Sequence, residues 1–168
     1  MDKREYSGAA LSSFVLAFEN SEKIIQKLLA DAGVDRIDAD RWYDHAWAIA
    51  IFYKIGEEVG RGALMEVGRR MIETATYPPG IDDITSLLAS LGVAYRLNAR
   101  GPDIGDVVCT FEDDHSATLD WSAKGPCALC WGILEGSCAR YGVKALIEHG
   151  GEGCKDTGAA TCIYHVSW

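Results

Sequence analysis

The amino-acid sequence predicts an α+β domain, in which N-terminal helices pack on an antiparallel sheet and the C-terminal half has the order β-β-α-β-β. Two observations lead to this prediction. Apolar residues recur at helical spacing up to about residue 91, and after Gly101-Pro102 the period changes to the alternation that is typical of strands. Of the 168 residues, 48% are hydrophobic, which is enough for a core, so we expect residues 1–168 to form a single domain.

The N-terminal half is predicted to contain four helices. In the first, Leu11, Phe14, Val15 and Phe18 fall at i, i+3, i+4 and i+7, and the pattern resumes after a jog near Asn20. A Tyr-Pro-Pro-Gly stretch is the clearest helix stop in the chain. The predicted helices cover residues 11–33, a segment from Asp38 or Asp40 to about 59, residues 63–76 and residues 81–91, with the stop at 77–80.

The C-terminal half is predicted to contain two hairpins around one helix. An acidic turn at 112–115 separates the first pair of strands, and a glycine-rich turn at 150–153 separates the second pair. Pro126 stands where the helix begins, because proline fits the first helical position. The predicted strands are 107–111, 117–121, 143–149 and 161–168, and the helix runs from 126 to about 141.

Charge and composition exclude some functions. A net charge of −9 disfavours nucleic acid and an anionic membrane surface as partners. No apolar run approaches the roughly 18–20 residues of a membrane span. The first residues lack the apolar stretch of a signal peptide, so we expect a cytoplasmic protein. In that compartment the six cysteines are expected to be free thiols or metal ligands rather than disulfides.

Three of these cysteines form a candidate zinc site. Cys127 opens the predicted helix, and Cys154 and Cys162 lie eight apart in the last hairpin. A tetrahedral zinc site needs a fourth ligand. Nearby candidates are Cys130, Glu148, Glu152 and His149, among which Glu148 is our assignment and Cys130 the first alternative. Two other interpretations stay open: inert thiols buried like small apolar side chains, or a disulfide.

Aromatic residues suggest a binding cavity. Five tryptophans and seven tyrosines would suit an apolar pocket between the helices and the sheet, one that takes a hydrophobic or aromatic small molecule. The alternative is that these side chains simply fill the core. The predicted wall residues are Trp42, Trp47, Tyr95, Trp121 and Trp131.

The last 42 residues carry a specific motif. It runs Cys127-x4-Gly132-x3-Gly136, then a strand containing Glu148, then Cys154-x7-Cys162 and a terminal strand. In this motif the chain resembles the 4-vinyl reductase domain family. The resemblance implies the fold of the haem nitric-oxide-binding domain and of the TRAPP tethering subunits. The two glycines, four apart on one helical face, would let another backbone come close.

The resemblance also implies a ligand set. Sensor members of the family bind zinc through three cysteines and a glutamate, and Cys127, Cys154 and Cys162 match the cysteines. The chain departs from the pattern at the glutamate position, which is Gly151 here. The Tyr-x-Ser-x-Arg pattern of the haem-binding relatives is absent, so haem is not expected.

A small-molecule-binding or sensing module is therefore the predicted function. No catalytic grouping is visible, which favours a binding protein over an enzyme. Two alternatives remain: an enzyme or enzyme accessory that acts on a tetrapyrrole or aromatic metabolite, and a scaffold without ligand. We also expect a homodimer that pairs through the N-terminal helices, because their broad apolar face must be buried.

Overall fold

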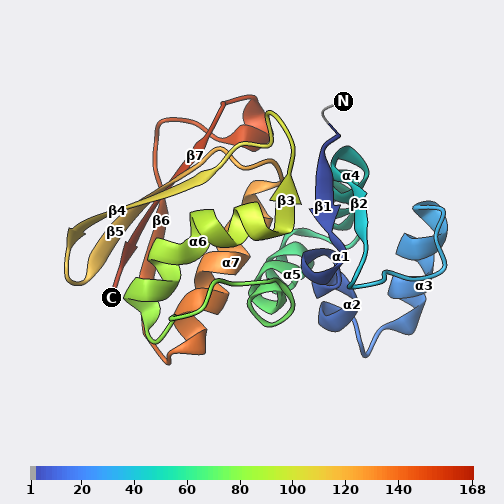
Figure 1. The fold of residues 1–168 in the computed structure, drawn as a ribbon, viewed down its shortest axis with the longest axis horizontal. Coiled ribbons are helices and arrows are strands. Elements are labelled where there is room, and N and C mark those ends of the chain that lie inside the picture. Colours follow the sequence, from blue (N-terminus) through green and yellow to red (C-terminus); the bar gives the residue numbers. More distant parts are fainter. Residues whose placement is uncertain (1–2) are drawn as a thin grey trace.

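The computed structural model describes residues 3–168 and confirms the α+β class, with helices packed around two antiparallel sheets (Figure 1). The four-stranded sheet has the order β4-β5-β7-β6 and belongs to the C-terminal half. A smaller sheet, of order β2-β1-β3, lies in the N-terminal half. Within residues 3–168, no helix combines the length and the apolar composition that a bilayer crossing requires.

The small sheet is a difference from the prediction. Its central strand β1 (Glu5–Ser7) pairs antiparallel with β2 (Trp42–Asp44) and β3 (Ala99–Arg100). Strands this short contain too few residues to show an alternating pattern. The sheet nevertheless brings β1 beside the end of the helix that precedes β3, and both contribute residues to the cavity described below.

The first predicted helix is divided into three: α1 (Gly8–Leu11), α2 (Ser13–Ala17) and α3 (Glu22–Asp31). At the first break the hydroxyl of Ser12 donates to the carbonyl oxygen of Gly8 at 2.7 Å. Leu11 and Phe14 are fully buried within the single chain, and α2 packs on α5 (Arg61–Thr74). The apolar face that was expected to need a partner chain is therefore covered from inside.

Local capping explains where the next helices begin. α4 (His45–Glu58) starts later than predicted because its cap is Asp44, whose carboxylate accepts the Trp47 N–H at 2.9 Å. α6 (Ile84–Asn98) starts at a capping box of Asp83 and Ser86 and continues well past the predicted end at residue 91. Gly92 allows this extension to lie against β4 (Val107–Asp113), since an added Cβ would meet the Val107 carbonyl oxygen at 2.4 Å.

The C-terminal half follows the prediction closely. β4 and β5 (Ser116–Trp121) form the first hairpin, α7 (Cys127–Arg140) follows, and β6 (Leu146–His149) pairs with β7 (Cys162–Ser167) across a loop that contains the short helix η1 (Lys155–Thr157). Alternate residues of β5 and β7 are buried on the face toward α7. The opposite face, with Thr118 and His165, is more exposed.

α7 lies unusually close to α5. A Cβ added at Gly132 would stand 2.1 Å from the Met65 carbonyl oxygen, and one at Gly68 would stand 2.3 Å from the Leu129 carbonyl oxygen. Gly136 likewise faces the backbone of Arg69. The two helices thus touch backbone to backbone, so the close approach that the glycines of α7 allow is to another helix of the same chain.

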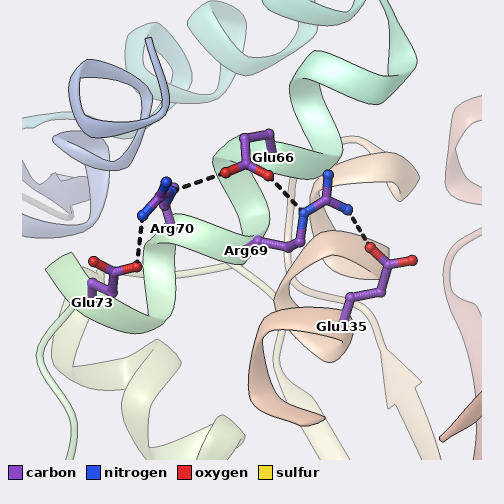
Figure 2. Close-up of polar contacts among 5 residues, drawn as sticks. All are labelled: Glu66, Arg69, Arg70, Glu73 and Glu135. Atoms are coloured by element: carbon purple, nitrogen blue, oxygen red, sulfur yellow. Dashed lines mark hydrogen bonds and ion pairs between the residues drawn. The ribbon is translucent and has the colours of Figure 1, made fainter. Parts of the chain in front are cut away.

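An ion-pair network follows the outer side of this contact (Figure 2). Arg69 bridges Glu66 on its own helix and Glu135 on α7, and Arg70 pairs with Glu66 at 2.9 Å and with Glu73 at 3.1 Å. These side chains are about one-third to one-half exposed, so each pair contributes at most about 1 kcal/mol to stability. The glycine contact, rather than the ion pairs, sets the position of α7.

Candidate functional site

The first candidate site is a cavity of about 50 Å³ between the two halves of the fold. It is lined by residues of the helices α1, α5, α6 and α7 and of the strands β1, β4 and β5. Most of the lining is apolar, and the polar groups are few. The lining residues are Tyr6, Ala10, Met71, Ala75, Tyr77, Leu91, Ala94, Tyr95, Asn98, Val107, Trp121, Ala123, Lys124, Leu129, Cys130 and Ile133.

Asn98 holds three segments together at the edge of this cavity. Its amide oxygen accepts from the Ser7 hydroxyl at 2.8 Å and from the Thr76 N–H at 3.0 Å. Its amide nitrogen donates to the carbonyl oxygens of Thr76 and Ala94. All four hydrogen-bonding positions of the side chain are occupied. Asn98 is therefore a structural link between β1, α6 and the segment after α5.

Tyr95 supplies a second polar group. Its hydroxyl donates to the Ile104 carbonyl oxygen at 2.7 Å and lies 3.4 Å from Nε2 of His45. Burial raises the pKa of Tyr95 well above its ordinary value, and burial followed by the charge of Arg4 lowers the pKa of His45. The tyrosine is thus neutral, and His45 favours its neutral form, beside the cavity.

Two of the predicted aromatic wall residues line the cavity, namely Tyr95 and Trp121. Trp131 lies on α7 but faces the sheet, where its ring packs edge-on against Tyr164 with centroids 6.1 Å apart. Helix spacing alone did not reveal this direction, because α7 is buried on nearly every side.

Trp42 and Trp47 also lie away from the cavity. Trp42 is in β2, with the guanidinium of Arg100 stacked 4.0 Å from its ring centroid. Trp47 stacks on Tyr43 with ring centroids 5.2 Å apart. Both were assigned to the wall as aromatic residues of a helix predicted to begin at Asp38 or Asp40, but α4 begins only at His45, and the Trp47 side chain turns away from the cavity to Tyr43.

The second candidate site is a cluster of three thiols and an imidazole. The ligand atoms of Cys127, His149, Cys154 and Cys162 all lie within 4.8 Å of one another. Cys127 begins α7, His149 ends β6, Cys154 precedes η1, and Cys162 begins β7. Sγ of Cys154 and Sγ of Cys162 are 3.7 Å apart. Metal–sulfur bonds of about 2.3 Å in a tetrahedral site imply nearly the same spacing, about 3.8 Å.

The imidazole of His149 is oriented for a ligand. Its Nδ1 lies 2.7 Å from the Gly150 carbonyl oxygen, so Nδ1 carries the proton that it donates there. Its Nε2 is buried and has no hydrogen-bond partner among the described residues. A histidine that donates one ring N–H to a carbonyl and leaves the other nitrogen free has the arrangement typical of a metal ligand.

The thiols also have supporting contacts. The Lys155 backbone N–H donates to Sγ of Cys162 at 3.3 Å, and the Tyr164 hydroxyl lies 3.0 Å from Sγ of Cys127. Burial, assisted by the neighbouring thiols, raises the pKa of Cys127 to about 12. A bound cation would reverse this shift, because it stabilises the thiolate form. The cluster has the donor set of a site for a thiolate-preferring metal ion.

Glu148, the predicted fourth ligand, is not in the cluster. Successive residues of β6 alternate between the two faces of the sheet, and Glu148 lies opposite His165 on the exposed side. His149 lies opposite the buried Tyr164 and so turns toward the thiols. Cys130, the first alternative, lies in the wall of the cavity instead.

Lys155 connects the two sites. Its backbone N–H binds Cys162 in the cluster, while its ammonium group donates to the Ala123 carbonyl oxygen at 2.5 Å and lies 3.7 Å from Sγ of Cys130. Ala123 and Cys130 both line the cavity. One residue thus touches the cluster and the cavity wall.

Comparison with known proteins shows the fold. No family model matches the sequence, and no curated protein matches it. Among solved structures, an H-NOX protein from S. oneidensis in the Fe(II)NO state has a TM-score of 0.69 at 15% identity, covering 96% of this chain and 98% of that chain. An oxygen-binding H-NOX domain related to soluble guanylate cyclases has a TM-score of 0.66 at 17% identity, covering 95% of this chain and 91% of that chain. A structure from a study of haem redox potential and porphyrin distortion has a TM-score of 0.70 at 15% identity, covering 96% and 99%.

These neighbours contradict zinc as the expected cofactor, because the cofactor in them is haem. The residues of this chain, however, do not fit haem. Among residues 3–168, no histidine lines the cavity, so the histidine that holds haem iron in globins has no counterpart in this lining. The cavity of about 50 Å³ is also far below the roughly 300–1,000 Å³ of ordinary ligand pockets. The chain has the H-NOX fold, around a cavity that is not built for haem.

Proposed function

We propose that residues 1–168 form one small-molecule-binding domain that works as a sensing module and holds a hydrophobic ligand in the cavity between the helices and the sheet. The observation that carries this proposal is the largely apolar lining with a few polar groups. The fold supports it, since the matching structures include an oxygen-binding domain.

Ligand entry requires some side chains to move. Met71 is the most adaptable of the apolar lining residues, because its unbranched thioether changes rotamer at little cost. Lys124 is exposed and can swing into solvent. Movement of these two side chains would enlarge the cavity without disturbing the helices.

We further propose that the cluster of Cys127, His149, Cys154 and Cys162 binds a soft divalent metal ion. We also propose that the chain is a member of the 4-vinyl reductase family, whose sensor members have such a cysteine site. The free Nε2 of His149 supports the metal site. Such an ion would join the start of α7 to the β6–β7 hairpin, so that its binding free energy would add to folding stability. A reducing cytoplasmic setting would keep the thiols available.

The ligand proposal is tested by thermal unfolding with a panel of unbranched alkyl, isoprenoid, aromatic and tetrapyrrole compounds. A ligand at a hundredfold excess over its dissociation constant stabilises the native state by about 2.7 kcal/mol. Ala75→Leu, which fills the cavity wall, should abolish the shift, whereas Ala139→Leu on the exposed side of α7 should keep it. If no compound raises the melting temperature of the wild-type protein, the scaffold alternative is favoured.

The metal proposal is tested by titrating reduced, metal-free protein with Co²⁺. Thiolate ligation of the ion gives intense near-ultraviolet charge-transfer absorption, and a tetrahedral site gives strong visible bands. We expect saturation at one ion per chain. Weak absorption at stoichiometric Co²⁺ would favour inert buried thiols.

The homodimer remains a prediction, and its expected surface has changed. Leu11 and Phe14 are fully buried in one chain, so the N-terminal helices no longer require a partner. Light scattering at micromolar concentration measures the mass directly, and a value near 18.3 kDa would exclude the dimer.

A further inference from the structure

A second depression adjoins the cavity and shares Lys124 with it. This groove, of about 360 Å³, is open to solvent and is lined by Arg4, His45, Ile49, Tyr53 and Lys124 among others. His45 lines the groove and contacts two residues of the cavity lining, with its ring 5.8 Å from that of Tyr6 and its Nε2 3.4 Å from the Tyr95 hydroxyl.

The groove is basic in a protein whose net charge is −9. Within residues 3–168, neither Arg4 nor Lys124 forms an ion pair, although the nearby Lys3 and Arg100 both pair with Glu5. The adjacent carboxylate of Asp44 is engaged in capping α4. Two exposed cations without a partner, above a buried imidazole, complement an anion.

The cavity, in contrast, suits a slim apolar group. Its volume of about 50 Å³ is well below the roughly 150 Å³ of an engineered apolar cavity that binds benzene. A ring system and an alkyl tail both need lining side chains to move, but an unbranched alkyl chain has the smaller cross-section and needs a narrower opening. Ala10, Ala75 and Ala94 leave the narrow space that the larger side chains do not fill.

We propose that the ligand is a small amphipathic anion, such as an alkyl carboxylate, with its tail in the cavity and its head group bound by Arg4 and Lys124 in the groove. This inference rests on the proposed function and specifies the ligand class. The head group and the tail of the ligand would each have a separate binding site, so the negative charge and the alkyl tail should contribute separately to affinity.

Isothermal titration calorimetry of the full chain tests the proposal with octanoate, octan-1-ol and acetate. We expect octanoate to bind at least about tenfold more tightly than octan-1-ol, and acetate to bind far more weakly than either. Arg4→Gln should lower octanoate affinity toward that of octan-1-ol and leave octan-1-ol binding unchanged, because Arg4 lines only the groove. Lys124→Gln should lower octanoate affinity more than octan-1-ol affinity, since Lys124 also lines the cavity. Lys144→Gln, at an exposed lysine outside both sites, is the matched control.

The outcomes separate this inference from the proposed function. Equal affinities for octanoate and octan-1-ol, unaffected by Lys124→Gln, would overturn the anion site and leave the apolar cavity standing. Acetate binding as tightly as octanoate would overturn the role of the tail. If neither octyl compound binds and Ala75→Leu changes nothing, the inference fails, and the cavity as a ligand site fails with it.

Discussion

The cluster and the cavity are built from very different spans of the chain. The four residues of the cluster lie between Cys127 and Cys162, on elements that follow one another directly. The cavity draws its lining from Tyr6 to Ile133, across both halves of the fold. A cluster of reactive side chains is marked by its residue types. A cavity is the space that packing leaves over, and no residue type marks it.

Gly132→Ala should have the largest effect, because it disturbs the helix that serves both regions. The new methyl group would stand 2.1 Å from the Met65 carbonyl oxygen, so α7 must shift away from α5. We expect a loss of about 1–3 kcal/mol in the free energy of unfolding, measured by urea denaturation. Gly62→Ala is the control, since open space surrounds Gly62 in α5, and it should stabilise by up to about 1 kcal/mol.

Cys154→Ser should separate the two regions by breaking the cluster alone. Serine is a poor ligand for a soft ion, so Co²⁺ affinity should fall by more than the roughly 10–100-fold that loss of a supporting contact costs. Cys154 is only half-buried, so the stability of the metal-free protein should change little. Cys109→Ser, at a half-buried thiol outside the cluster, should leave Co²⁺ binding unchanged. Unaltered Co²⁺ affinity in Cys154→Ser would refute the ligand set.

Tyr95→Phe acts only at the cavity. It removes the hydrogen bond from the hydroxyl to the Ile104 carbonyl oxygen, which should cost about 1 kcal/mol. Tyr6→Phe should cost less, because the Tyr6 hydroxyl contacts only Sδ of Met71, at 3.8 Å, within residues 3–168. Thermal unfolding of the two variants compares them directly, and the reverse order would contradict the assigned contacts.

Arg69→Gln should have the smallest effect. It breaks the ion pairs to Glu66 and Glu135 on the outer side of the α5–α7 contact (Figure 2). Both carboxylates are about one-third exposed, so we expect about 0.5 kcal/mol or less, decreasing further in high salt. A loss as large as that of Gly132→Ala would show that the charges, and not the glycines, position α7.

The sequence predicted the elements whose patterns are local. Both C-terminal hairpins and α7 were located from alternation and turn residues, and three of the four cluster residues from cysteine spacing. The fourth residue, His149, was among the candidates, but the assignment went to Glu148, one position away. A single-residue step along a strand moves a side chain to the other face, and the sequence did not show which of the two faces the thiols.

The remaining differences come from contacts that are distant in sequence. The strands β1, β2 and β3 are too short to show an alternating pattern. They form because the fold brings together three segments that are far apart in the sequence. α6 continues past Gly92, and the absence of a side chain there lets β4 approach the helix closely. The polar residues of the cavity, such as Tyr6 and Asn98, belong to no sequence motif, so the sequence did not mark them as lining residues.

Lys155 contacts both sites, so binding at one of them can affect the affinity of the other. Its backbone holds a cluster sulfur, and its side chain holds the wall of the cavity. If a ligand in the cavity displaces that side chain and changes metal affinity by some factor, the metal must change ligand affinity by the same factor, because linkage is reciprocal. Under the proposed function, occupancy of the cavity would then change metal binding at the β6–β7 hairpin.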